Sequence, residues 1–231
     1  MAEVLEIGDP PVAVRLRRTA RARRLSLRIS GADGKVSLTV PPSVSLSEAK
    51  AFLRDKESWL QGHLSQAPEL VEVGVGTVLP VDGVAREIVE ARRRSVGLFE
   101  AHLAVPYGAS QAGARVQAFL KTRARDRLVA ACDHYAAKLG RPYQRITLRD
   151  TRTRWGSCSS EGNLMFSWRL CLAPPEVLDY VAAHEVAHLA EMNHSPQFWA
   201  TVASLLPAYD GPRKWLRREG SSLHRYRFAG R

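Results

Sequence analysis

The segment His184-Glu185-Val186-Ala187-His188, with a further histidine at His194, constrains this chain more than any other stretch. Residues four apart on a helix lie one turn above each other, so His184 and His188 can present imidazole nitrogens to a single ion. A catalytic zinc ion takes three protein ligands and leaves a fourth position open for water. The spacing therefore predicts a helix that ends in a turn, with His194 as the third ligand of one Zn²⁺ per chain.

Two carboxylates close to these histidines are candidates for the chemistry. Glu185 lies beside the first ligand, where it can take a proton from metal-bound water, and we predict it to be the general base of a hydrolase. Glu191 follows His188 by three residues and so lies on the same side of a helix. It could orient a ligand imidazole, act as a fourth ligand, or be a surface carboxylate.

Composition sets the broad class of protein. The chain has 231 residues with 45% apolar and 25% charged side chains, which is ordinary for a globular protein. It contains no apolar run of eighteen residues, so we expect no membrane partner. The first twenty residues do not resemble a secretory signal, and three widely spaced cysteines without a C-x-x-C motif are typical of reduced thiols. We therefore expect a cytoplasmic protein.

The net charge of +11 is unevenly distributed. Residues 1–110 hold 15 Lys/Arg against 13 Asp/Glu, a net charge of +2, whereas residues 111–231 hold 19 against 10, a net charge of +9. A basic field around a cleft favours anionic partners, so nucleic acid is a possible partner of this surface. A basic surface without a ligand is an equally simple interpretation.

The first 110 residues are predicted to form a β-rich region with one helix. Alternating apolar residues over 25–29 and 36–40 flank turn residues at 31–34, which indicates a hairpin. A helix is predicted over 48–64 with Ser47 as its N-cap, and strands return between 74 and 106. Nothing in this region assembles a catalytic set.

Residues 111–231 have the element order of a minimal zincin, a metal-dependent hydrolase domain. We predict a long helix, a small sheet of antiparallel or mixed strands, a motif helix beginning at Pro175, and C-terminal helices. The chain is therefore predicted to be α+β. These elements are expected at 114–139 (helix), 145–148 and 164–170 (strands), 175–191 (motif helix), from Ser195-Pro196 (helix) and at 213–218 (helix).

The spacing of the three histidines equals that of the metzincins, but two features exclude that group. Glu191 stands where metzincins have glycine, and no methionine follows Met192 to make the Met-turn. The turn before His194 must be made differently, and we expect Asn193 to adopt the left-handed conformation that asparagine tolerates.

A series of uncommon short sequence motifs, taken in order along the chain, resembles the YgjP-like family of zinc metallopeptidases. That family is related to the SprT and WLM peptidase-like families. The resemblance covers most of residues 111–218, with looser matches before it. It implies a zincin fold, zinc on His184, His188 and His194, and Glu185 as base; Val186 departs mildly from the usual leucine. The motifs that carry the resemblance are Arg154-Trp155-Gly156-Ser157-Cys158, Trp168-Arg169-Leu170 with Pro174, Tyr180-Val181, Asn193-His194-Ser195 and Phe198-Trp199.

The resemblance leaves the substrate open, because a nucleoside triphosphate pyrophosphatase activity is also associated with the family. In the peptidase hypothesis, an edge strand near Trp155 to Cys158, including Ser157, aligns the peptide. The donor that stabilises the oxyanion would be Arg154, Tyr209 or His224.

In the pyrophosphatase hypothesis, Arg152 and Arg154 would bind the phosphates, since a guanidinium matches their geometry. Trp155 or Trp168 would stack on the base. A third hypothesis is a non-catalytic, zinc-stabilised module that binds nucleic acid. The presence of Glu185 argues against it, because a structural zinc site needs no base.

Overall fold

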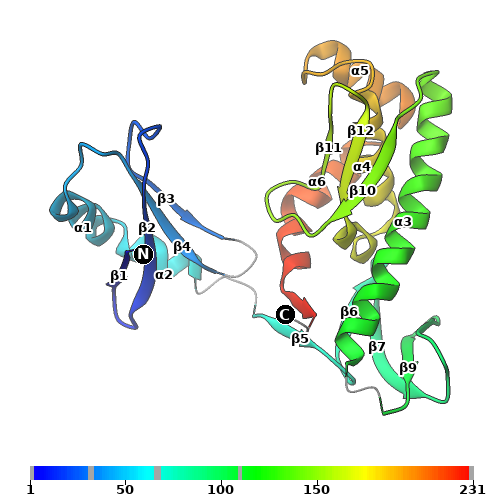
Figure 1. The fold of residues 1–231 in the computed structure, drawn as a ribbon, viewed down its shortest axis with the longest axis horizontal. Coiled ribbons are helices and arrows are strands. Elements are labelled where there is room, and N and C mark those ends of the chain that lie inside the picture. The colour runs from blue at the N-terminus through cyan, green and yellow to red at the C-terminus, as the bar shows by residue number, and fades with distance from the viewer. Residues whose placement is uncertain (1–2, 31–33, 65–68, 109–110, 229–231) are drawn as a thin grey trace. The chain divides into compact units, whose positions relative to one another are not determined.

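The computed structural model describes residues 3–30, 34–64, 69–108 and 111–228. The chain divides into two compact units, Met1–Glu69 and Leu70–Arg231 (Figure 1). The sequence predicted a boundary between residues 110 and 111. In the structure, the strands between residues 71 and 106 belong to the second unit instead. No helix in the described ranges is both long and apolar enough to cross a bilayer.

The first unit is a four-stranded sheet with two helices on one face. The sheet order is β1-β2-β4-β3, in which β2 and β4 are parallel and the other neighbours antiparallel. Apolar residues of β2 and β4 pack with α1 and α2 to form a separate core around Leu38, Leu53 and Leu60. The elements are β1 (Val4–Ile7), β2 (Val12–Arg18), β3 (Ser26–Ile29), β4 (Val36–Val40), α1 (Leu46–Asp55) and α2 (Glu57–Leu64).

The predicted hairpin is confirmed by the antiparallel pairing of β3 with β4, although residues 31–33 of its turn lie outside the described residues. The single helix predicted over 48–64 is instead two helices, because the backbone leaves helical geometry at Lys56. The N-cap is Ser45 rather than Ser47. Its side chain accepts from the Glu48 amide, and the Glu48 carboxylate accepts from the Ser45 amide, which is a capping box.

The second unit begins with strands that pack on its longest helix, α3. The sheet order is β6-β7-β9-β8, while β5 pairs in parallel with the C-terminal strand β13. The elements are β5 (Val71–Val73), β6 (Val78–Val81), β7 (Val84–Ala91), β8 (Gly97–Leu98), β9 (His102–Pro106), α3 (Ala112–Leu139) and β13 (Tyr226–Phe228). Their buried side chains share one core with the rest of this unit, which explains the position of the boundary.

A polar contact fixes the turn between β6 and β7 to the rest of the unit. The Asp82 carboxylate accepts from Arg123 Nε at 2.8 Å and also pairs with Arg127, both on α3. The Asp82 amide donates to the Cys171 carbonyl at 2.8 Å. Gly83 has a φ of 74°, and a Cβ there would lie 2.9 Å from Cα of Pro174. The turn therefore lies directly against the segment that leads into the motif helix.

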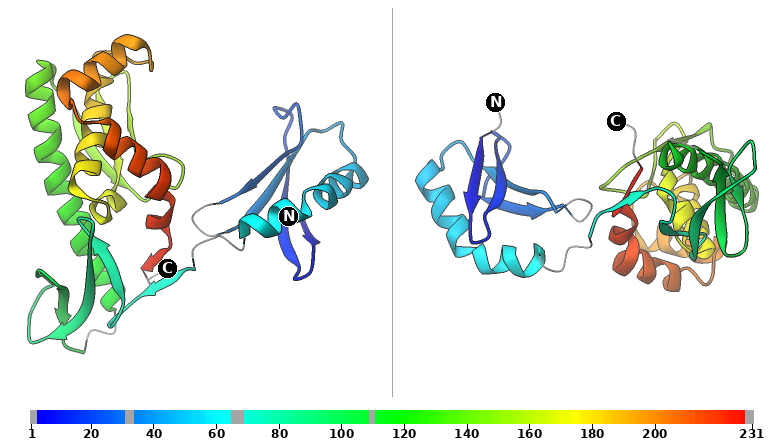
Figure 2. Two further views of the ribbon diagram at one scale, coloured as in Figure 1. Left: turned by 180° about the vertical axis from the view of Figure 1, so that it is seen from behind. Right: turned by 90° about the horizontal axis from the view of Figure 1, so that it is seen from below.

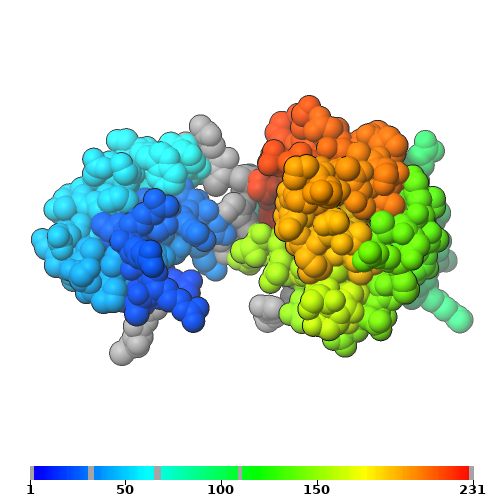
Figure 3. Space-filling model, turned by 90° about the horizontal axis from the view of Figure 1, so that it is seen from above, coloured from blue at the N-terminus to red at the C-terminus, as the bar shows by residue number. Residues whose placement is uncertain are grey.

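The remaining elements give the predicted minimal zincin arrangement, and the α+β class is confirmed. The small sheet has the order β10-β12-β11, so β11 is an edge strand. Helix α3 packs beside α4 and β10 (Figure 1), and α5 and α6 form much of one face of this unit (Figure 3). The elements are β10 (Arg145–Arg149), β11 (Gly156–Cys158), β12 (Asn163–Ser167), η1 (Trp168–Leu172), α4 (Pro175–Ala187), α5 (Pro196–Leu205), α6 (Asp210–Glu219) and η2 (Gly220–His224).

Two boundaries near the motif differ from the prediction. The strand predicted over 164–170 ends at Ser167, and the chain continues as the buried 3₁₀ turn η1. The motif helix ends at Ala187 instead of Glu191. The amides of Leu189 and Ala190 bond three residues back, which tightens the last turn.

Candidate metal centre

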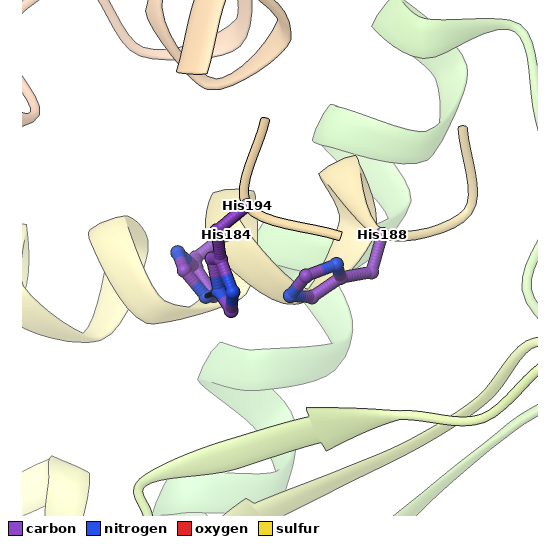
Figure 4. A group of neighbouring side chains, drawn as sticks. All are labelled: His184, His188 and His194. Carbon is purple, nitrogen blue, oxygen red and sulfur yellow. Dashed lines mark hydrogen bonds between the residues drawn. The ribbon is translucent and has the colours of Figure 1, made fainter. Parts of the chain in front are cut away.

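The three histidines of the motif come together at the end of α4. His184 lies in its last turn, His188 is its C-cap, and His194 precedes α5. Their candidate ligand nitrogens all lie within 4.8 Å of one another. Figure 4 shows the rings of His184 and His194 side by side, with the ring of His188 directed toward them. The structure thus brings together the ligand set that the sequence predicted.

The separation of one pair of these nitrogens suits a tetrahedral ion. Nε2 of His184 and Nε2 of His194 are 3.1 Å apart. Two nitrogens bound to one zinc at about 2.0–2.1 Å in tetrahedral geometry lie roughly 3.3 Å apart. Three imidazoles without a thiolate or carboxylate form a donor set that zinc accepts readily. The residues present therefore fit a divalent ion of this kind.

Burial keeps the ligand imidazoles in the form that binds metal. It lowers the pKa of His184 to about 3, and the neighbouring His188, His194 and Arg213 lower it further in the same direction. Burial also lowers the pKa of His188. Because a metal ion needs a neutral imidazole, both side chains are ready to bind at neutral pH.

Glu191 orients a ligand through its backbone. Nδ1 of His188 lies 2.9 Å from the Glu191 carbonyl, and since a carbonyl only accepts, the ring donates through Nδ1 and leaves Nε2 for the ion. The sequence left three roles open for the Glu191 carboxylate, namely orienting a ligand imidazole, acting as a fourth ligand, or lying on the surface, and the contact seen here uses the backbone carbonyl instead. The contact exists because the chain turns back immediately after α4, which places that carbonyl beside Nδ1.

The turn before His194 is built by side chains. The Ser195 amide donates to Oδ1 of Asn193 at 3.1 Å, and Oγ of Ser195 accepts from the Phe198 amide to cap α5. The expectation of left-handed backbone at Asn193 was wrong, because its φ is not positive. An asparagine side chain can close a turn by bonding the amide two residues ahead, so the backbone needs no special conformation.

Aromatic rings of α5 pack against the three histidines. Phe198 stacks on His188 with centroids 4.4 Å apart and meets His184 edge-on at 4.9 Å. Trp199 lies 6.0 Å from His194, and Arg213 lies over Trp199 at 4.1 Å. The sequence did not single out Phe198, Trp199 or Arg213 as site residues. The helical spacing of Phe198 and Trp199 after His194 was the available signal.

Glu185 is 5% exposed and lies against the edge strand β11. A Cβ built on Gly156 would be 2.5 Å from Oε1 of Glu185, so only glycine leaves room for the carboxylate there. Burial raises the pKa of Glu185 to about 8, and the positive charge of Arg154 partly opposes that rise. Gly156 is thus a residue of the site that the sequence placed in a motif without assigning it a role.

A cleft of about 250 Å³ opens between β11 and the histidines. Its walls are the three histidines, Glu185, Met192, Arg154 and residues 156–158. Arg154 and Ser157, both predicted to bind substrate, therefore line it. Burial raises the pKa of the Cys158 thiol to about 11. This side chain therefore lines the cleft as a protonated thiol, which is not a nucleophile.

Three other predicted substrate residues are not among those that line this cleft in the described part of the chain. Trp155 is half-buried and stacks on His224 at 5.0 Å, so both belong to the packing behind β11. Tyr209 stacks on Trp199 at 5.7 Å. Arg152 is exposed outside the cleft. Trp168, the other tryptophan considered for stacking, is 1% exposed and is part of the core.

Comparison with known proteins gives one match to a family and one to a solved structure. The model of the family described as YgjP-like, metallopeptidase domain, matches residues 23–219. No curated protein matches the chain. The crystal structure of the metallopeptidase zymogen of Pyrococcus abyssi abylysin aligns with 21% identity and a TM-score of 0.37, covering 43% of this chain and 97% of the other.

Proposed function

We propose that this chain, which belongs to the YgjP-like family of metallopeptidase domains, is a zinc-dependent peptidase with Glu185 as its general base. The observation that carries the proposal is the convergence of His184, His188 and His194 beside a buried glutamate. A purely structural site would close its fourth position with a protein side chain and would have no use for a base.

The edge strand β11 gives the substrate its position. One side of the strand pairs with β12, and the other side is the free edge beside the cleft. An extended peptide can add to such an edge through backbone hydrogen bonds, which hold it regardless of its side chains. Ser157 is the middle residue of β11, and Arg154 lies two residues before the strand begins.

Glu185 handles the proton. A zinc ion held by the three histidines would supply the Lewis acidity that activates water and polarises the scissile carbonyl. The positive charge of that ion would favour the ionised form of Glu185 despite its burial. The carboxylate accepts the proton of the attacking water and returns it to the leaving amine. Because Gly156 has no Cβ, the carboxylate of Glu185 lies directly against β11, the strand at which we place the peptide.

Arg154 is the best placed of the oxyanion candidates, because it lines the cleft, whereas Tyr209 and His224 stack on other rings outside it.

We propose that the protein acts in the cytoplasm, since Cys132, Cys158 and Cys171 are free.

The test presents the zinc-loaded protein with a peptide library and a nucleoside triphosphate panel side by side. We expect cleavage of peptides only. Release of pyrophosphate without peptide cleavage would replace the peptidase with the pyrophosphatase, and no turnover of either class would overturn the hydrolase.

Metal content provides the second test. We expect about one zinc per chain by elemental analysis and its loss in His188→Ala. His134→Ala is the matched control, because His134 is an exposed histidine on α3 outside the cluster. Equal retention of zinc in both variants would contradict the assigned ligands.

A further inference from the structure

The sheet of the first unit has one face that its own helices leave open. The buried residues of β2 and β4 alternate along each strand and pack under α1 and α2. Figure 2 shows both helices along one side of this sheet. Because successive side chains of a strand point to opposite faces, the residues between the buried ones share the open face.

Two rows of polar side chains cross this open face. The pairing of β2, β4 and β3 places Arg15, Ser37 and Arg28 in one row. The next row consists of Arg17, Thr39 and Ser26. With strands about 4.8 Å apart and side chains on one face about 6.7 Å apart along a strand, the three arginines form a compact triangle. We call these six residues the arginine face.

Charge is concentrated on this side of the unit. Residues 12–40 contain eight Lys/Arg against one acid, a net charge of +7, whereas residues 46–64 contain three of each. Arg15, Arg17 and Arg28 are exposed and make no hydrogen bond or ion pair with any described residue. On the outer strand β1, Glu6 lies opposite Ala13, and the exposed Val4 lies opposite Arg15.

We propose that the arginine face binds the phosphate backbone of nucleic acid. A guanidinium matches a phosphate with two parallel hydrogen bonds, and hydroxyl groups placed between arginines donate to further phosphate oxygens. The proposal is independent of the peptidase activity, because none of these residues belongs to the metal centre.

The composition of the face selects this partner over others. A membrane-binding surface needs several apolar side chains that insert beside its cations. Apart from the exposed Val4, which lies opposite Arg15 on β1, the two rows contain only arginine and hydroxyl side chains. They also contain no aromatic ring on which a base could stack, so the contacts are with phosphates and read no sequence. We therefore expect the affinity for nucleic acid to depend steeply on salt concentration and little on base sequence.

The experiment measures binding of the full chain to fluorescently labelled oligonucleotides by anisotropy. Single-stranded DNA, duplex DNA and single-stranded RNA of equal length and mixed sequence are compared at several salt concentrations. The test variant is Arg15→Gln/Arg17→Gln/Arg28→Gln. The control variant, Arg115→Gln/Arg125→Gln/Arg149→Gln, removes the same charge from exposed positions of the second unit.

We expect the test variant to bind at least about tenfold more weakly at 0.1 M salt. Its slope of log affinity against log salt should fall by about two to three, as three lost phosphate contacts require. The control variant should stay close to wild type. If both variants bound oligonucleotides equally weakly, the loss of affinity would come from net charge and not from this face. If the wild-type chain bound anionic vesicles but not oligonucleotides, the face would be a membrane contact. Either outcome overturns the proposal.

Folding of the test variant is checked by its circular dichroism and its zinc content. The three substituted side chains are exposed, so both should match wild type. Loss of oligonucleotide binding with both properties intact supports the proposal, and retained binding in the folded variant overturns it.

Discussion

The least exposed arginines of the second unit and the sheet arginines of the first unit differ in their partners. In the second unit, Asp82 pairs with Arg123 and Arg127, and the buried Arg169 pairs with Asp150. These pairs hold segments together that are distant in sequence. In the first unit, the arginines of the open sheet face make no such pairs among the described residues. Paired arginines thus connect distant segments of the unit that carries the metal centre, whereas the three sheet arginines of the first unit remain available for a ligand.

This difference separates two functions along one chain. The metal centre needs histidines and a glutamate held in fixed positions, and α4, β11 and α5 supply that support. A phosphate backbone needs only accessible cations on a firm surface, which a sheet backed by two helices supplies. Each of the following predictions changes one unit and uses the other as an internal reference.

The largest effect is expected from Glu185→Gln. The amide cannot accept the proton of the attacking water, so peptide turnover should fall by roughly 10²–10⁴-fold or more. Zinc content and oligonucleotide binding should not change. Glu191→Gln is the control, because Glu191 acts through its carbonyl and that variant should keep its activity. Unchanged turnover in Glu185→Gln would remove the residue from its proposed role.

The next effect is on stability and comes from Arg169→Ala. Arg169 is 8% exposed, forks onto Asp150 at 2.6 and 3.2 Å, and donates to the carbonyls of Leu223 and Tyr226 at 3.0 Å each. Its removal leaves buried acceptors without a donor and should lower the free energy of unfolding of the second unit by about 3 kcal/mol. Urea unfolding followed separately for each unit measures this.

Arg149→Ala is the control for Arg169→Ala, because Arg149 is an exposed arginine on β10. It should change the stability of the second unit by less than about 0.5 kcal/mol. The transition of the first unit should stay in place in both variants. A shift of both units together would show that the two do not unfold independently.

The sequence was a good guide where the determinants are local. Helical spacing located His184 and His188, and Gly140 with Pro142 indicated the end of α3, which the left-handed glycine confirms. The unit boundary could not be read in this way. It depends on contacts between segments distant in sequence, namely the core that β5 to β9 share with α3 and the pairing of Asp82 with arginines 41 and 45 residues later, and no local pattern shows these contacts.

Other features of the site were hidden for a different reason. The group that orients His188 is a backbone carbonyl, and every residue has one, so no side-chain pattern identifies it. Trp155 lies in a polar motif but faces His224, because strand β11 has its cleft on one side and packing on the other. Which side a residue takes depends on the strand's neighbours.

A pH-dependent effect should be confined to the second unit. Burial, together with Arg169, lowers the pKa of His224 to about 4, against about 6.5 in the unfolded chain. Between these values the unfolded chain binds more protons, so the free energy of unfolding falls as the pH is lowered, by up to about 3 kcal/mol from pH 7 to pH 4.

Unfolding at several pH values, with a chelator present so that metal release does not contribute, measures the effect of His224. The variant His224→Phe keeps a ring against Trp155 and lacks the titrating group. Its stability should depend less on pH than that of wild type over the same range. An identical pH dependence in the two proteins would assign the effect to other groups.

The smallest effect is expected in the first unit, from Ser45→Ala. The Ser45 side chain satisfies the Glu48 amide and completes the capping box of α1, so its loss should cost this unit about 1 kcal/mol and leave the second unit unchanged. Ser47→Ala is a sharp control, because Ser47 lies two residues away, is exposed, and lies inside the helix. If Ser47→Ala destabilised the unit and Ser45→Ala did not, the helix would begin where the sequence alone had placed it. The arginine face should bind oligonucleotides equally well in both variants, since the cap stabilises the helix behind the sheet and contributes no cation to its open side.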